Sequence, residues 1–250
     1  MLCLGACAYA PSPGAGSDAP VNGDDALAGQ DSPASTDTGN PGCTNIAFRS
    51  LQATTSGATD SIVIATPIGV LPGDLLIASL LYLSDSDEQP GSLQTPGGWT
   101  EIQQRSFGAN DSIGLSMFRR EVVTGEPATH TWNAGQSKRF DVVIEAYTGV
   151  DAADPIEGAA SQTNSQSTNI AGPGASSPAC GMIVSAFGIR SVSTFTSPAN
   201  MDERGQLTNA QGAAISLLVV ERQLEGAMAA VTATATTSAV SIGMTVALKP

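Results

Sequence analysis

Short runs of apolar residues, separated by turn-forming residues, make up most of the chain after Cys43. Several of these runs alternate, so that one face of an extended strand would point to a core and the other to solvent; residues 140–147 are an example. Turn signals such as Pro-Gly-Asp at 72–74 and Pro-Gly-Gly at 96–98 lie between them. The pattern predicts seven strands in the first half: 46–53, 61–66, 75–83, 99–106, 113–123, 129–133 and 140–147. We therefore expect an all-β fold, an antiparallel, jelly-roll-like β-sandwich.

The second half of the chain repeats the order of strands and turns of the first half, at a spacing of about 101 to 107 residues. The matched segments are 75–79 with 182–186, 95–99 with 197–201, 116–120 with 217–221, and 142–146 with 243–247. This repeat predicts an internal duplication with halves at about 44–156 and 157–250. It also predicts three equivalent pairs that point inward: Trp99 with Met201, His130 with Val231, and Trp132 with Ala233.

Two arrangements satisfy the duplication: a single sandwich in which the halves are related by a pseudo-twofold axis, or two consecutive small sandwiches. Residues 157–177 are polar and rich in Gly, Ser and Asn, as a linker between two units would be. The second half has only Phe187 and Phe195 as aromatic residues, too few for a substantial core of its own. We therefore expect one compact unit over residues 43–250.

The N-terminal segment predicts export. Residues 1–7 are apolar and end in Leu-Gly-Ala-Cys, which resembles a bacterial lipobox with Cys7 as the acylated residue. The alternative is an apolar leader unrelated to lipidation. Residues 8–42 contain five Asp and no Lys or Arg, and they are rich in Pro, Gly and Ser, so we expect a disordered tether. The predicted location is the outer membrane or cell surface as a lipoprotein, or the extracellular space.

Composition excludes two classes of partner. The formal net charge of −13 would repel the phosphate backbone of a nucleic acid. No apolar run reaches the roughly 18 to 20 residues of a membrane-spanning helix, so contact with a membrane is expected only through the lipid anchor. The partner classes that remain are a glycan or a protein at the cell surface.

Cys43 and Cys180 are the only cysteines of the predicted folded part. In an oxidising compartment such a pair more often forms a disulfide than a metal site, and neither residue has the spacing of a zinc ligand. We predict a Cys43–Cys180 disulfide, with two free thiols as the alternative. The bond would add about 4 to 5 kcal/mol of stability in the chain-entropy model.

His130 and the two tryptophans are candidates for binding or catalysis, but packing explains them more simply. Strand alternation places His130 on the same face as Trp132, at a position that is apolar in the repeat. With one histidine in the chain and no nucleophile elbow, a catalytic triad has little support. Trp99 follows a Gly turn, as a core residue would. We interpret all three as core residues.

Acidic residues offer two further hypotheses. Asp85, Asp87 and Glu88 place hard oxygen ligands close together, so calcium is the one cofactor considered, with a solvated acidic loop as the alternative. Five glutamates in or near strands could supply the carboxylate pair of a glycosidase: Glu101, Glu121, Glu145, Glu157 and Glu221.

A set of motifs in order gives a family resemblance: Pro72-Gly73-Asp74-Leu75-Leu76, Pro96-Gly97-Gly98-Trp99-Thr100, residues 126–132 (Glu-Pro-Ala-Thr-His-Thr-Trp) and residues 146–151 (Ala-Tyr-Thr-Gly-Val-Asp). The set resembles a β-sandwich module of bacterial exported proteins and phage structural proteins. The resemblance covers about residues 46–250 and implies a fold and a location, but no catalytic residues. We expect a surface-displayed, non-enzymatic binding or structural module, with a carbohydrate-active enzyme that uses paired carboxylates as the alternative.

Overall fold

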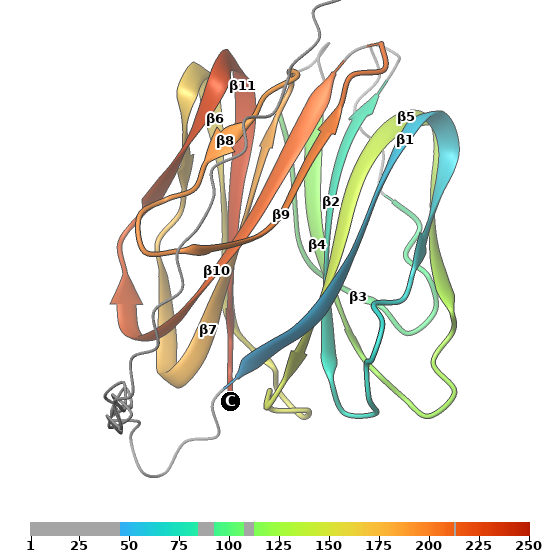
Figure 1. The fold of residues 1–250 in the computed structure, drawn as a ribbon, viewed down its shortest axis with the longest axis vertical. Coiled ribbons are helices and arrows are strands. Elements are labelled where there is room, and N and C mark those ends of the chain that lie inside the picture. Colours follow the sequence, from blue (N-terminus) through green and yellow to red (C-terminus); the bar gives the residue numbers. More distant parts are fainter. Residues whose placement is uncertain (1–45, 85–92, 108–112, 213) are drawn as a thin grey trace, which may run out of the picture. The chain divides into compact units, whose positions relative to one another are not determined.

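The computed structural model of the chain describes residues 46–84, 93–107, 113–212 and 214–250. These residues form eleven strands in two antiparallel sheets, as expected for a β-sandwich (Figure 1). The described part contains no helix that is long and apolar enough to cross a membrane.

The first half of the chain forms one complete sheet, called sheet A. Its strands are β1 (Ala47–Ala65), β2 (Leu75–Ser84), β3 (Thr100–Phe107), β4 (Ile113–Glu121) and β5 (Thr129–Thr148), in the order β1-β5-β2-β4-β3. The second half forms sheet B from β6 (Ile156–Gly172), β7 (Ala175–Ile189), β9 (Asp202–Asn209), β10 (Ile215–Met228) and β11 (Val231–Leu248), in the order β6-β11-β7-β10-β9. The short strand β8 (Phe195–Thr196) pairs with β11. The two sheets have the same strand order, strand for strand, as the duplication predicts.

Pairing registers extend the match to single residues. Ile144 pairs with Ala78 in sheet A, and Thr245 pairs with Ser185 in sheet B, as the repeat spacing requires. The registers of β4 and β10 differ from the alignment of the repeat. Met117 of β4 pairs with Ser79, whereas Val219 of β10 pairs with Ala186, the residue equivalent to Ser79. Met117 is therefore equivalent to Val219, not to Leu218, and the predicted β4–β10 alignment is one residue out of step. A slip of one residue exchanges the two faces of a strand, so this error is structurally significant.

The two sheets share one apolar core. Alternate residues of the central strands point between the sheets, where both halves contribute; examples are Ile77, Leu81, Val184, Leu217 and Val246. At the sides of the sandwich β1 lies against β9 and β3 lies against β6. Because β1 is equivalent to β6, and β3 to β9, these two contacts are related by the pseudo-twofold symmetry of the duplication.

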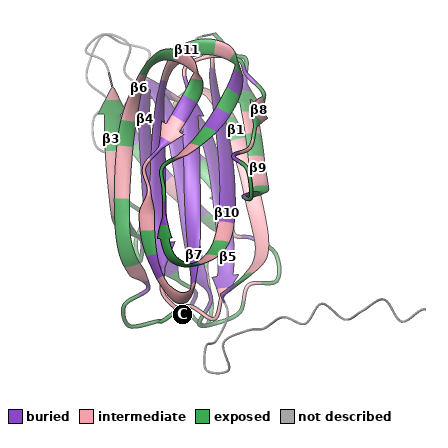
Figure 2. Cartoon of the chain, turned by 90° about the vertical axis from the view of Figure 1, so that its left-hand side faces the viewer, coloured by how far each residue is buried: buried purple, intermediate pink, exposed green. Residues whose placement is uncertain are grey.

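Each sheet also has an apolar core on its outer face. Strands β1 and β5 are long and shift register between Ser56 and Ser61, where β-bulges bend the paired strands so that their far end covers sheet A. Trp132 and Ile62 of that far end pack on the outer face together with Phe118. The paired strands β6 and β11 bend in the same way, and Figure 2 shows their intermediate and exposed residues in front of the buried strands.

Three predictions of local structure are wrong. Residues 46–53 and 61–66 are not two strands but parts of the continuous β1, and 129–133 and 140–147 both belong to β5. The polar stretches between them bend without ending the strand. Residues 157–177, expected as a linker, form β6 and the start of β7. Each half of the chain builds a whole sheet, so the sandwich contains one sheet from each copy of the repeat.

Candidate functional site

One cluster of polar side chains lies inside the shared core, where β5 faces β9 and β10. Glu145 and Tyr147 of β5 are fully buried, and Glu221 of β10 is 2% exposed. Arg204 of β9 closes the outer side of the cluster: its Nη2 donates to Glu221 Oε1 at 2.5 Å, and its guanidinium lies 4.4 Å from the centre of the Phe48 ring. The structure thus brings together two of the glutamates that the sequence offered as a carboxylate pair.

The electrostatics of this cluster are unbalanced. Two carboxyl groups face a single cation, and Arg204 is already engaged by Glu221. Burial raises the pKa of Glu145 to about 8, with a further contribution from the charge of Glu221, while Tyr147 and Arg204 lower it. Burial and the two carboxyl groups raise the pKa of the Tyr147 hydroxyl well above its ordinary value. Neither oxygen of Glu145 forms a hydrogen bond of normal geometry, although the Tyr147 hydroxyl is close enough to affect its pKa.

The fold does not require this polar cluster, because the equivalent place in the other copy is mostly apolar. The equivalent residues are Val246 for Glu145, Leu248 for Tyr147, Arg119 for Glu221 and Ile102 for Arg204. Arg204 and Ile102 even occupy the same β-bulge in their respective edge strands. The polar residues therefore distinguish one of two structurally equivalent positions.

A second polar cluster covers the outer core of sheet A around His130. Arg120 donates to Glu126 at 2.5 and 3.1 Å and to the Gly97 carbonyl at 2.6 Å. His130 Nε2 lies 3.0 Å from Thr66 Oγ1 and 3.6 Å from Glu126 Oε1. Burial lowers the pKa of His130, against the opposing charge of Glu126.

The geometry around His130 does not match that of a catalytic triad. A triad uses one ring nitrogen for the nucleophile and the other for the acid, whereas Thr66 and Glu126 both approach Nε2. The Thr66 hydroxyl donates its one hydrogen to the Pro127 carbonyl at 2.5 Å, so toward His130 Nε2 it can act only as a hydrogen-bond acceptor. His130 is 4% exposed and packs edge-on against Trp99, as its predicted role in the core requires.

The burial predicted for these pairs is largely confirmed, although they lie in the outer cores of the two sheets and not between the sheets. Trp99 and Met201 are 7% and 8% exposed, and Trp132 and Ala233 are fully buried. Val231 is the exception, because it is only half-buried beside the outer core of sheet B.

A third buried carboxyl group, that of Asp141, was not among the candidates predicted from the sequence. Asp141 lies on the inner face of β5, where burial raises its pKa to about 8, and Asn209 of β9 partly offsets that shift. The side-chain amide of Asn209 donates to the main-chain carbonyls of Ser56 and Phe140, which ties β9 to sheet A. The alternation of residues 140–147 could have indicated that Asp141 is buried, because Asp141 and Glu145 fall on the same face of the strand as the apolar Val143.

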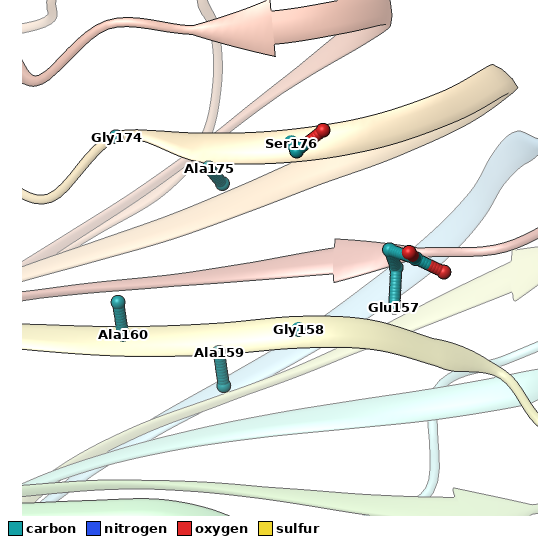
Figure 3. Close-up of a pocket in the computed structure, with 7 residues that line it drawn as sticks. All are labelled: Glu157, Gly158, Ala159, Ala160, Gly174, Ala175 and Ser176. Atoms are coloured by element: carbon teal, nitrogen blue, oxygen red, sulfur yellow. The ribbon is translucent and has the colours of Figure 1, made fainter.

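A small pocket on sheet B has few polar side chains in its wall. It measures about 230 Å³ and lies between the start of β6 and the start of β7 (Figure 3). Gly158, Ala159, Ala160, Gly174 and Ala175 form most of its wall, and Glu157 and Ser176 supply the polar side chains. Glu157 is already paired with Lys249 at 3.3 Å.

Exposed aliphatic side chains gather on two neighbouring loops that we call the loop tip, residues 66–74 and 122–128. Main-chain hydrogen bonds join the two loops, from Gly73 to the Val122 carbonyl and from Thr66 to the Ala128 carbonyl. Ile68, Leu71 and Val123 are 86%, 55% and 50% exposed. In the other copy the corresponding segments continue as paired strands, with Gly226–Met228 of β10 on 175–177 of β7.

The remaining candidate residues are dispersed or lie outside the described part. Glu101, Glu121 and Glu157 are exposed on β3, β4 and β6, away from the buried pair. Cys180 takes part in a disulfide, but Cys43 lies outside the described residues, so the Cys43–Cys180 pairing stays a prediction. The same holds for the lipidation of Cys7, the tether 8–42 and the calcium ligands Asp85, Asp87 and Glu88. The described residues contain no group of three potential metal ligands.

No protein-family model, no curated protein and no solved structure matches this chain. The resemblance to a β-sandwich module of exported bacterial proteins and phage structural proteins therefore stays an expectation based on the sequence motifs.

Proposed function

We propose that the protein is a non-enzymatic binding or structural module, exported and displayed at the bacterial cell surface, and that its loop tip contacts a protein partner. The observation that carries the proposal is the gathering of Ile68, Leu71 and Val123 on two hydrogen-bonded loops. Exposed apolar side chains that cluster on one surface are typical of interaction sites.

The side chains of the loop tip favour a protein over a glycan. Sugars commonly stack on exposed aromatic rings, but both tryptophans are buried, and within the described ranges no aromatic side chain is fully exposed. Aliphatic side chains suit the apolar centre of a protein interface. Glu121 is exposed next to this surface and the chain has a net charge of −13, so the expected partner surface is apolar with a basic rim.

The alternative, a carbohydrate-active enzyme, has one supporting observation: Glu221 is close enough to Glu145 for its charge to raise the pKa of the Glu145 carboxyl group. Both residues are enclosed between the sheets, where a sugar ring has no access. A glycosidase needs its two carboxyl groups on either side of a bound glycosidic bond.

Site-specific cross-linking tests the binding proposal. A photoreactive amino acid replaces Leu71 in the full chain, and the same probe at Val192, an exposed aliphatic position in the other half, is the control. We expect intact cells that display the protein to yield a discrete cross-linked protein only from position 71. Cross-links of equal yield from both positions, or none from position 71, would contradict the proposal.

Two assays separate the other functions. A glycan array probed with the full chain, with and without calcium, would favour a glycan partner if binding appeared. Hydrolysis of a panel of polysaccharides that is lost in Glu145→Gln would establish the enzyme instead. Surface display is tested separately, because Cys7→Ser should release the protein from the membrane fraction.

A further inference from the structure

The cluster of Glu145, Tyr147, Glu221 and Arg204 lies where the two halves of the duplicated fold meet. Glu145 and Tyr147 belong to β5 of sheet A, whereas Glu221 and Arg204 belong to β10 and β9 of sheet B. Any interaction of the two β5 residues with the residues of β9 and β10 therefore acts directly on the contact between the sheets. Two apolar sheets would pack without it, as the equivalent residues of the other copy do.

The charges in this enclosed space decide how the sheets can pack. If both glutamates are ionised, the buried groups carry two negative charges and one positive charge, and Glu145 has no hydrogen-bond donor of normal geometry. Burial of an unpaired charge is strongly unfavourable. A proton on Glu145 leaves the Arg204–Glu221 ion pair as the only charges, and the cluster is then neutral.

Among the described residues, Arg204 is the one cation that affects the ionisation of Glu145. Strand β9 supplies Arg204 and, 4.0 Å from its guanidinium, the exposed Asp202, which adds a further negative charge. Strand β10 supplies Glu221, and β5 itself supplies Tyr147. The neighbours of Glu145 on β1 and β2 are Leu51 and Ile77, which carry no charge.

We propose that this cluster is a proton-controlled latch between the two sheets: the sheets are held together while Glu145 carries a proton, and the β9–β10 side loosens when that proton is lost. Glu145 is the switch, Glu221 and Arg204 form the fixed ion pair, and Tyr147 lines the space between them. The latch operates at mildly alkaline pH, since the pKa of Glu145 is about 8.

The direction of the pH effect follows from the linkage between proton binding and folding. The folded state holds the proton more tightly than the unfolded state, so the stabilisation is complete below pH 4.5 and is lost as the pH rises to about 8. The unfolding equilibrium constant of the wild type should therefore rise by about a thousandfold over this range from Glu145 alone. Asp141 contributes a dependence of the same sign, so only the difference between the wild type and a Glu145 variant isolates the latch.

The test uses Glu145→Gln in the full chain, because a neutral amide imitates the protonated acid. The unfolding equilibrium constant, measured by urea unfolding, should rise between pH 5 and pH 9 by a factor that is about a thousandfold smaller in this variant than in the wild type. Hydrogen exchange of the β9 amides, corrected for intrinsic rates, should accelerate at pH 9 in the wild type and not in the variant. Glu101→Gln, which removes an exposed carboxyl group from β3, should behave as the wild type.

Two further measurements keep the proposal testable if Glu145→Gln folds poorly. Glu145→Val installs the residue found at the equivalent position 246 and should also lose the pH dependence. Carboxyl NMR of the wild type should show Glu145 titrating above pH 7. The proposal is overturned if Glu145 titrates near pH 4.5, or if a folded Glu145 variant retains the pH dependence of the wild type.

Discussion

Removal of one partner of the buried Arg120–Glu126 ion pair should destabilise the protein more than any comparable surface change. In Glu126→Gln the size of the side chain is kept, but the charge that balances Arg120 is lost. The two side chains are 9% and 8% exposed, and Arg120 is held at 2.5 and 3.1 Å by Glu126. Breaking a buried pair in this way costs about 3 kcal/mol, which lowers the melting temperature of a domain of this size by about 6–12 °C.

The assay is urea unfolding of the full chain at pH 7, with Asp154→Asn as the matched control. Asp154 forms an ion pair with Lys249 at 2.6 Å, but its side chain is 69% exposed, so solvent screens the pair and we expect no measurable change. The slope of free energy against urea should remain that of the wild type, because the exposed area is unchanged. Equal losses in Glu126→Gln and Asp154→Asn would refute the reasoning.

Three further outcomes are expected. Trp132→Ala should cost about 3–5 kcal/mol in urea unfolding, because Trp132 is fully buried against Phe118; a loss below 1 kcal/mol would contradict its place in the core. His130 binds a proton less readily when folded, so its contribution to stability is lost as the pH falls below about 6.5; His130→Gln should flatten the stability curve between about pH 6.5 and 5, and an unchanged curve would disprove this. Peptide mapping without reduction should recover Cys43 linked to Cys180, and a free Cys43 thiol would exclude the pair.

The two polar clusters differ in how they could be recognised. His130 and Trp132 alternate within one strand, so the sequence itself indicated that both face the core. Glu145 and Glu221 are 76 positions apart in the numbering and belong to different sheets, so their proximity depends on how the sheets stack. No pattern within either strand contains that information.

The lengths of the strands were also decided by tertiary contacts and not by the local sequence pattern. Residues 54–60 and 134–139 are polar or Gly-containing, which predicts a break, yet β1 and β5 continue through them with bulges. Pairing with a long partner and burial of Trp132 on the outer face outweigh the weak local preference for strand. The polar β6 forms for the same reason, since β11 supplies its hydrogen bonds.

The sequence by itself determined the all-β class, the central strands and the duplication, because alternation and turn residues are local signals and a repeat preserves their order. Only the tertiary structure decided the one-residue register of β4 and β10, the bending of the long strand pairs and the enclosure of Glu145 with Glu221. These features depend on contacts between residues far apart in the chain. Their free energy comes from burial and from charges that meet only after the two sheets have packed.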